Sequence, residues 1–159
     1  MTKITLNPIP ITRENFAPYG NVIDLQDGTE LSAIGEYEYY NGTAIKVIRG
    51  NKISMPYEVK LFERHPIGTQ AFVPMNSGVF FVVVAESTNT DSFDPNTLKC
   101  FITNGRQGIQ YNVNVWHAPF TTLTDDADFT VIDRFPFEND PQDINIDFAE
   151  FPDTEIIVE

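Results

Sequence analysis

The stretch of sequence that decides the fold is residues 63–75, which read Glu-Arg-His-Pro-Ile-Gly-Thr-Gln-Ala-Phe-Val-Pro-Met. If residues 60–65 form a strand, their side chains alternate between its two faces with a period of two. Glu63 and His65 then lie on one face, and Arg64 lies on the other. The pattern therefore predicts a carboxylate and an imidazole that point the same way.

A turn is expected directly after this strand. Pro66 and Gly68 are poor residues for a paired central strand, because proline lacks an N–H and glycine has no side chain to pack. We expect residues 69–73 to return beside the first strand. That return would bring Gln70 back towards His65.

The spacing of these polar residues resembles the first metal-binding motif of the cupin barrels, which reads His-x-His followed by Glu. Glu63 stands in the place of the first His, and Gln70 stands in the place of the Glu. The second cupin motif, a Gly followed further on by a strand His, is matched by Gly108 and His117. The resemblance implies an all-β fold, a cupin-like antiparallel β-barrel of the jelly-roll type.

The composition favours a single globular domain that is rich in strands. The chain has 159 residues, which suits one domain with a core of its own. It is 42% apolar and contains 13 Phe and 6 Tyr, residues that favour strands. We therefore expect residues 1–159 to form one cupin-like domain.

Short runs separated by turn residues predict the individual strands. The expected strands are residues 21–25, 44–48, 53–62, 79–85, 98–103, 107–112, 115–121 and 129–134. Two pairs of neighbouring strands are expected among them. Residues 44–48 would pair with residues 53–62 around a turn at 49–51, and residues 107–112 would pair with residues 115–121. Thr12 can cap a short N-terminal helix over residues 12–19.

Residues 79–85 are nearly all apolar, so this strand is expected to be covered on both faces. One cover would be the barrel interior, and the other could be a partner subunit. The end of the chain, residues 138–159, alternates apolar residues with acids and is expected to lie over the barrel or over a partner. These features favour a homodimer.

The charge and the apolar pattern argue against several kinds of partner. The net charge is −13, and no Lys or Arg follows Arg134, whereas nucleic-acid binding needs clustered basic side chains. No apolar run is long enough to span a bilayer, and the N-terminus does not resemble a secretory signal. The single cysteine, Cys100, can form no internal disulfide. We expect a cytoplasmic protein that acts on a small molecule.

A more specific resemblance covers about half of the chain strongly. The chain closely resembles the ureidoglycolate lyase family at residues 63–75, at Phe-Ile-Thr-Asn-Gly (101–105), Gly-Ile-Gln-Tyr (108–111), Val-Trp-His-Ala-Pro (115–119) and Asp-Phe-Thr-Val-Ile-Asp-Arg (128–134). Residues 138–159 resemble nothing that we recognise in that family. The resemblance implies a homodimeric lyase that splits ureidoglycolate into glyoxylate and urea in allantoin (purine) degradation. It also implies a divalent metal, with a preference for nickel.

The two histidines of the chain, His65 and His117, are the candidates for the chemistry. Imidazole titrates near neutral pH and also ligates metals, so two in one pocket suit acid and base catalysis or metal binding. With Glu63 and Gln70 they offer two nitrogen and two oxygen donors, which suit Ni, Mn, Fe or Zn. We expect these four residues to be catalytic and to be possible metal ligands. The alternative is a hydrogen-bond network without metal, in which Gln70 orients His65.

Four further residues are expected to bind the substrate: Arg134, Tyr111, Trp116 and Arg64. Arg134 is the candidate for holding a carboxylate, because a guanidinium grips carboxylates with two hydrogen bonds. It could instead pair with Asp133. Tyr111 and Trp116 are expected as pocket walls with a polar tip. Strand alternation favours the opposite sheet surface for Trp116, and for Arg64 a surface or interface ion pair.

Two positions depart from the family pattern. Family members commonly have Tyr-His where this chain has Tyr111-Asn112, and Trp-His-His where this chain has Trp116-His117-Ala118. If either missing histidine carries the proton, the chain would bind the substrate without turning it over or would act on another one. Two other functions therefore stay open. They are a metal-dependent cupin oxygenase or isomerase acting on another small acid, and a non-catalytic cupin that binds a small carboxylate.

Overall fold

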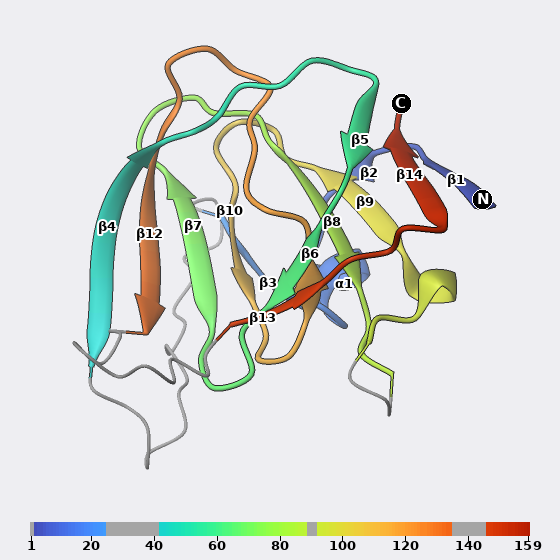
Figure 1. Cartoon of the computed structure of the whole chain (residues 1–159). Coiled ribbons are helices and arrows are strands. Elements are labelled where there is room, and N and C mark those ends of the chain that lie inside the picture. The colour runs from blue at the N-terminus through green and yellow to red at the C-terminus, as the bar shows by residue number, and fades with distance from the viewer. Residues whose placement is uncertain (1, 25–41, 89–91, 135–145) are drawn as a thin grey trace.

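Strands make up almost all of the regular structure. The computed structural model describes residues 2–24, 42–88, 92–134 and 146–159 (Figure 1). Within these ranges the helical elements are α1 (Arg13–Phe16) and the short 3-10 helix η2 (Pro95–Thr97). No helix in the described ranges is long and apolar enough to cross a membrane. The all-β class with a short N-terminal helix is confirmed.

The strands form three sheets. The first has five antiparallel strands in the order β3 (Gly20–Ile23), β10 (Gly108–Tyr111), β7 (Gln70–Pro74), β12 (Asp128–Arg134) and β4 (Thr43–Arg49). The second has six strands in the order β13 (Asp147–Ala149), β6 (Phe62–Arg64), β11 (Trp116–His117), β8 (Phe81–Ala85), β9 (Lys99–Ile102) and β2 (Ile9–Pro10). The third has three strands in the order β1 (Thr2–Leu6), β14 (Thr154–Val158) and β5 (Tyr57–Val59). Only the β1–β14 and β2–β9 pairs of these sheets are parallel.

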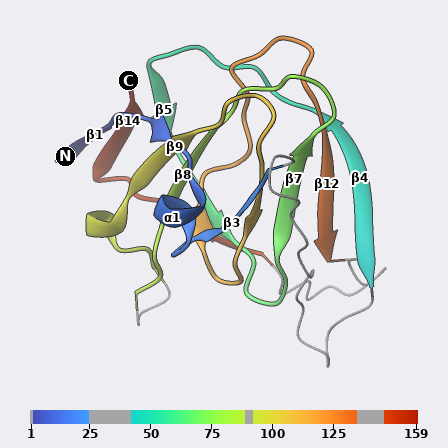
Figure 2. The same cartoon turned by 180° about the vertical axis from the view of Figure 1, so that it is seen from behind.

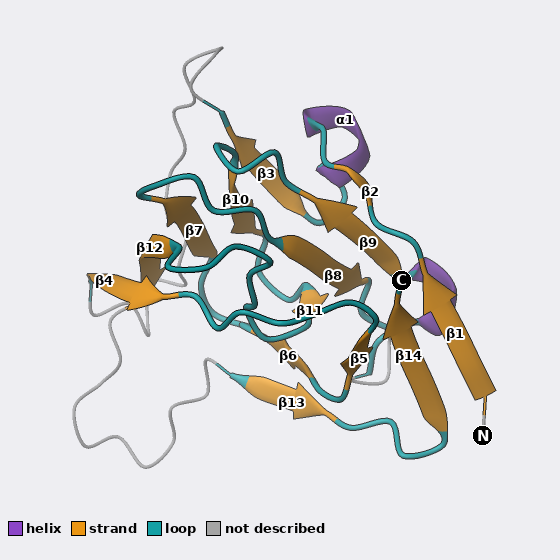
Figure 3. Cartoon of the chain, turned by 90° about the horizontal axis from the view of Figure 1, so that it is seen from above, coloured by secondary structure: helices purple, strands orange, loops and turns teal. Residues whose placement is uncertain are grey.

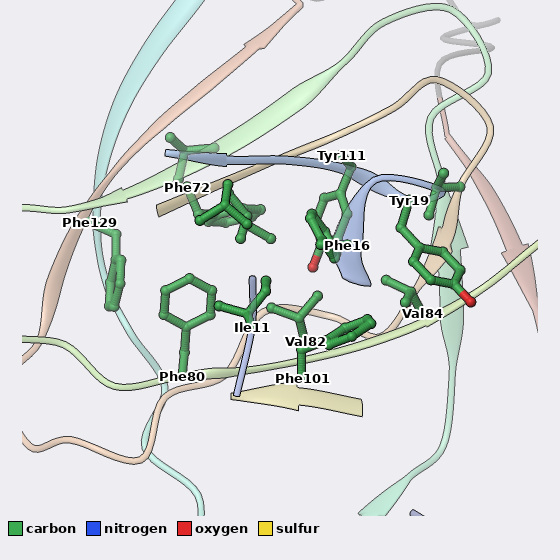
Figure 4. Close-up of a cluster of buried hydrophobic side chains, with 14 of the residues drawn as sticks. Ile11, Phe16, Tyr19, Phe72, Phe80, Val82, Val84, Phe101, Tyr111 and Phe129 are labelled. Atoms are coloured by element: carbon green, nitrogen blue, oxygen red, sulfur yellow. The ribbon is translucent and has the colours of Figure 1, made fainter. Parts of the chain in front are cut away.

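The larger core lies between the five-stranded sheet and one face of the six-stranded sheet (Figure 4). The five-stranded sheet contributes Phe72 and Phe129, and the facing strands contribute Val82, Val84 and Phe101. Alternation puts the small β-branched and the aromatic residues of each strand on this inner face, where they leave water together. The two sheets thus enclose one apolar interior. The cupin-like antiparallel barrel expected from the sequence is confirmed.

A second core covers the other face of the six-stranded sheet. Phe81, Val83 and Ala85 of β8 pack there against the three-stranded sheet, which contributes Val59 and Ile156. Seen from above, β8 lies between β7 on one side and β14 on the other (Figure 3). All five residues of β8 are buried, as expected for this strand. Its second cover is the chain's own third sheet, however, and not a partner subunit.

Helix α1 closes one side of the barrel core (Figure 2). Thr12 Oγ1 accepts a hydrogen bond from the Asn15 N–H, and Asn15 Oδ1 accepts one from the Thr12 N–H, so the predicted cap is present. The helix ends at Phe16, short of the predicted residue 19, because the chain turns and enters β3 at Gly20. A Cβ at Gly20 would collide with the Gln110 carbonyl group of the neighbouring strand.

The predicted hairpin between residues 44–48 and 53–62 is wrong. Strand β4 is present, but it pairs along its whole length with β12. After Gly50 the chain hydrogen-bonds to a distant loop instead, through Gly50 N–H to Ala127 O and Ile53 N–H to Thr122 O. It then reaches β5, which belongs to the third sheet and pairs with β14.

Two further pairings differ from the prediction for one physical reason. Strand β7 pairs with β10 and β12, and not with β6, and β10 and β11 also lie in different sheets. In both places the chain crosses the end of the barrel from one sheet to the other, so a short connection does not form a hairpin. The second crossing is fixed by Asn114, whose φ is 67° and whose N–H donates to the His65 carbonyl oxygen over 2.9 Å.

The other expected strands are present. Residues 79–85, 98–103 and 129–134 contain β8, β9 and most of β12, and 21–25 contains most of β3, with residue 25 outside the described ranges. The described end of the chain, 146–159, lies over the chain's own barrel. There β13 pairs with β6, and β14 pairs with β1 and β5.

Candidate active site

A row of polar side chains crosses the inner face of the five-stranded sheet. Gln70 of β7 lies opposite Tyr111 of β10. On the other side β12 pairs with β7 up to Ile132, and one step further in this register Asp133 lies opposite Gln70. The next inner row is apolar and consists of Val131, Phe72 and Ile109. The barrel interior therefore changes from apolar to polar within one row of side chains.

The facing sheet presents the carboxylate and both histidines. Glu63 of β6 and His117 of β11 are direct partners in neighbouring strands, and His65 follows just after the end of β6. One ligand atom from each of these three residues lies within 4.8 Å of the others. The rings of the two histidines are 5.3 Å apart between centroids. The prediction that Glu63 and His65 share a face holds in the structure, and His117 joins them.

His117 is held in one orientation and one tautomer. Its Nδ1 lies 2.9 Å from the Val115 carbonyl oxygen, which can only accept, so Nδ1 carries the hydrogen. Tyr111 stacks on the imidazole with the ring centroids 4.0 Å apart. The remaining nitrogen, Nε2, is buried and lies 3.4 Å from Glu63 Oε1. A metal cation bound at Nε2 would therefore lie beside this carboxylate.

The electrostatic environment of Glu63 favours its charged form. Burial would raise the pKa of this carboxyl group, but hydrogen bonding to His117 and the positive charge of His117 and His65 outweigh burial and lower the pKa. Burial and the charge of Glu63 raise the pKa of Tyr111, so its phenol keeps its proton. The site thus contains a carboxylate and two imidazoles beside a neutral phenol.

These donors fit a divalent metal ion. Two imidazole nitrogens and a carboxylate oxygen can converge on one point, and His117 Nε2 has no polar partner other than Glu63 among the described residues. Such a mixed nitrogen and oxygen set suits Ni, Zn, Fe or Mn. Gln70 can add an oxygen from the facing sheet. Its Nε2 donates to Asp133 Oδ2 over 3.2 Å, and its buried Oε1 has no hydrogen-bond partner among the described residues.

Three of the predicted substrate-binding residues do not join the histidines. Trp116 faces the second core, on the other side of the sheet from His117, as alternation favours. Arg64 also lies there, with its guanidinium 4.6 Å above the Trp116 ring and an ion pair to Asp147 at 2.8 Å. Arg64 is only 9% exposed, but the Asp147 side chain is 42% exposed, so the ion pair is partly buried and reaches the surface at Asp147. Arg134 is buried, and alternation from Asp133 puts it on the outer face of its sheet.

The two departures from the family pattern also lie away from the histidines. Ala118 packs in the second core beside Trp116, and Asn112 is exposed after the end of β10. A histidine at either position would point away from the interior in which His65 and His117 meet. These departures therefore remove no group from the site described here.

Sequence reasoning missed Asp133 as a member of the site. It was considered only as a partner of Arg134, whose backbone N–H does donate to Asp133 Oδ1 over 2.7 Å. The signal was the alternation of β12, since Phe129 and Val131 are buried in the barrel core and Asp133 continues the same face.

Comparisons with known proteins show the family of the chain. A family model described as ureidoglycolate lyase matches residues 3–157, so the resemblance also includes most of residues 138–159. Ureidoglycolate lyase of Brucella anthropi is 39% identical over 79% of this chain and 80% of its own. Ureidoglycolate lyase of Brucella ovis is 38% identical over 82% of this chain and 83% of its own. Ureidoglycolate lyase of Pseudomonas aeruginosa is 35% identical over 82% of this chain and 83% of its own.

Among solved structures, RmlC from Streptococcus suis in complex with dTDP-D-xylose superimposes with a TM-score of 0.38 and 9% identity. The superposition covers 62% of this chain and 45% of that one. This weak likeness adds nothing to the fold described above. The family match and the identities to curated relatives are what identify the chain: it belongs to the ureidoglycolate lyase family.

Proposed function

We propose that this protein is a lyase that splits ureidoglycolate into glyoxylate and urea, as a step of allantoin degradation. The observation that carries the proposal is the cluster of Glu63, His65 and His117 inside the barrel of a chain from this family. The substrate carbon bears a hydroxyl and the ureido nitrogen. Loss of the hydroxyl proton and protonation of that nitrogen break the C–N bond and leave an aldehyde, and no water is consumed.

In the proposed mechanism the two histidines carry out the two proton transfers. His117 Nε2 takes the hydroxyl proton, because the hydrogen bond from Nδ1 to Val115 leaves a lone pair on Nε2. Glu63, 3.4 Å away, stabilises the imidazolium that forms. As the carbonyl forms, the C–N electron pair moves to the ureido nitrogen, which takes a proton from protonated His65. A proton then passes from His117 to His65 to restore the starting state.

In the alternative form of the proposal, Glu63, His65 and His117, with Gln70 as a further oxygen donor, would hold a divalent metal. An imidazole that binds the metal would then be a ligand and not a proton carrier. When bound there, a metal would supply a Lewis acid next to the substrate hydroxyl. Nickel is the metal that we propose, following the family resemblance. In the holoenzyme Glu63 still provides the negative charge of the site, since its lowered pKa keeps it ionised at neutral pH.

For substrate binding we propose Tyr111 as a wall of the pocket, whereas Arg134, on the outer face of its sheet, is proposed only as a buried support of β12. Tyr111 is supported by its stacking on His117. Trp116 and Arg64 remain in the proposal as residues that support the strands from behind, because both lie on the opposite face of the sheet. Arg64→Ala would then change stability more than turnover.

The experiment that tests the function is the release of urea and glyoxylate from ureidoglycolate by the purified protein. His65→Ala and His117→Ala are each expected to lower the rate by ~100 to 10,000-fold, the usual effect of removing a positioned acid or base. Lys52→Ala is the control, since Lys52 forms an exposed ion pair with Asp125. Full activity of both histidine variants, or binding of ureidoglycolate by the wild type without turnover, would reject the proposal.

We also keep the homodimer, the single domain and the cytoplasmic location as proposals. Ile45 and Val47 of β4 are 72% and 65% exposed, which supports an apolar contact between copies. Sedimentation of the protein at micromolar concentration tests the dimer, and a species of only 18.0 kDa would contradict it. Limited proteolysis tests the single domain, and cell fractionation tests the location.

A further inference from the structure

Asp133 and Gln70 form a partly buried pair at the polar end of the barrel. The two residues lie opposite each other in the register of β12 and β7, and both point to the inner face. Gln70 is 8% exposed. Its Nε2 lies 3.2 Å from Asp133 Oδ2, while Asp133 Oδ1 accepts from the Arg134 backbone N–H over 2.7 Å. Asp133 is thus tied to its own backbone and reaches the Gln70 amide with its second oxygen.

This pair decides which end of the Gln70 amide faces the site. A carboxylate has acceptors and no donor, so the NH2 group of Gln70 must face Asp133. The carbonyl oxygen, Oε1, is then turned away from Asp133. It is buried without a hydrogen-bond partner among the described residues, and the next side chain along its row is Tyr111, which stacks on His117. A buried acceptor left without a donor destabilises the protein unless a ligand supplies the donor.

We propose that Asp133 is a positioning residue that fixes the Gln70 carbonyl oxygen as a hydrogen-bond acceptor for the ureido N–H groups of the substrate. The inference rests on the proposed function in its metal-free form, in which Gln70 Oε1 is not a metal ligand, and it names the part of the substrate that Gln70 recognises. The ureido group is rich in N–H donors, and a fixed carbonyl oxygen is their natural partner. A carboxylic acid that lacks the ureido group has nothing to donate to it.

The same pair explains why this position holds Gln and not the Glu of the cupin motif. A Glu at position 70 would bring a second carboxylate to the 3.2 Å contact with Asp133, and two like charges at that distance repel strongly. With Gln the contact becomes a charge-assisted hydrogen bond. The negative charge of the pair then stays on Asp133, and the site receives a neutral acceptor.

The test compares two unreactive ligands by isothermal titration calorimetry with the full-length protein. One is oxalurate, in which a carbonyl replaces the carbinol carbon of ureidoglycolate and the ureido group is kept. The other is oxalate, which has no ureido group. In Asp133→Asn the side-chain oxygen keeps the hydrogen bond from the Arg134 N–H, so its NH2 group faces Gln70 and the Gln70 amide turns its carbonyl oxygen towards position 133 and away from the site. We expect roughly tenfold weaker binding of oxalurate, the effect of one hydrogen bond, and less than about twofold change for oxalate.

Asp128→Asn is the matched control. It removes one carboxylate from the other end of the same strand, where Asp128 pairs with Arg49 at the surface, and should change neither affinity. Gln70→Met, which removes the acceptor at nearly equal size, should reproduce the selective loss of oxalurate binding. It serves as the second variant if Asp133→Asn does not fold.

A swap of the pair provides the rescue. Gln70→Glu alone should bind oxalurate less well, because it faces Asp133 with a like charge. In the double variant Gln70→Glu/Asp133→Asn the Asn NH2 can donate to the new carboxylate, so oxalurate binding should recover to within about threefold of wild type. This recovery would not follow from a role of Asp133 in stability alone.

The outcomes separate the inference from the proposed function. Equal loss of both ligands in Asp133→Asn, no loss of either, or a wild type that does not bind oxalurate would overturn the inference. Selective loss of oxalurate in a protein that never releases urea from ureidoglycolate would support the inference and reject the lyase.

Discussion

The rings of Tyr111 and His117 lie face to face, with centroids 4.0 Å apart and an angle of 14° between their planes. The two residues come from different sheets, so this stack joins the two walls of the barrel at the site. Together with the hydrogen bond from His117 Nδ1 to Val115 it fixes the imidazole in the plane in which Nε2 faces Glu63.

Replacing the Tyr111 ring should therefore lower the rate through His117. Tyr111→Phe keeps the stack and is expected to stay within about threefold of wild-type kcat. Tyr111→Leu removes the flat surface and is expected to lower kcat by ~10 to 100-fold, because a positioned base that loses its orientation loses most of its contribution. Steady-state kinetics measures both. Equal kcat values for the two variants would contradict the role of the stack.

Nickel binding should depend on Glu63. The carboxylate is the only charged donor among the three clustered residues when both imidazoles are neutral. Glu63→Gln keeps the shape but removes the charge, and we expect at least tenfold weaker binding in a titration of metal-free protein with nickel. Glu58→Gln is the matched control, since Glu58 lies half exposed on β5. Equal affinities of wild type and Glu63→Gln would show that nickel binds elsewhere.

Cys100 should be inert in the folded protein. Burial raises the pKa of its thiol to about 12, so at pH 8 almost none of it is the reactive thiolate. We expect no reaction with a colorimetric disulfide reagent in the native state and one equivalent after denaturation. Above about pH 9 the unfolded state loses the thiol proton of Cys100, whereas the folded state keeps it. The contribution of Cys100 to stability therefore decreases as the pH rises through this range.

The local features of the fold could be predicted from the sequence, because they depend on neighbouring residues. The shared face of Glu63 and His65 follows from strand alternation, the start of α1 from the cap at Thr12, and the burial of β8 from its composition. Strand partners could not be predicted in the same way. Alternation states which face a side chain occupies, but the partner of β4 is β12, about 80 residues away.

The candidate site shows the same limit. Gln70 does reach the polar end of the barrel, but it comes from the facing sheet and not from the strand beside His65. The sequence predicts a hairpin at the short turn after His65, whereas this turn carries the chain across the end of the barrel. Asp133 was within reach of sequence reasoning, since its face follows from Phe129 and Val131. Its pairing with Gln70 depends on the register between β7 and β12, which the sequence does not show.

Arg64 should matter for stability and not for turnover. Its Nε and one terminal nitrogen both lie 2.8 Å from Asp147 Oδ2, and its guanidinium covers Trp116. These contacts tie β13 to β6 and β11 on the face opposite the histidines. Arg64→Ala should lower the free energy of unfolding by about 2–3 kcal/mol, from the loss of a charged hydrogen bond and the cation–π contact. Its kcat should stay within about threefold of wild type.

Urea denaturation and steady-state kinetics on the same preparations test this assignment. Arg64→Lys keeps the charge but cannot place two nitrogens on Asp147, so its free energy of unfolding should lie between those of Arg64→Ala and the wild type. Asp147→Ala combined with Arg64→Ala should destabilise by less than the sum of the single variants, because each removes the same ion pair. Arg49→Ala, which removes an exposed ion pair, should have little effect on stability. A large loss of kcat/KM in Arg64→Ala at unchanged stability would instead restore Arg64 as a substrate-binding residue and would require its side chain to reach the histidine face of the sheet.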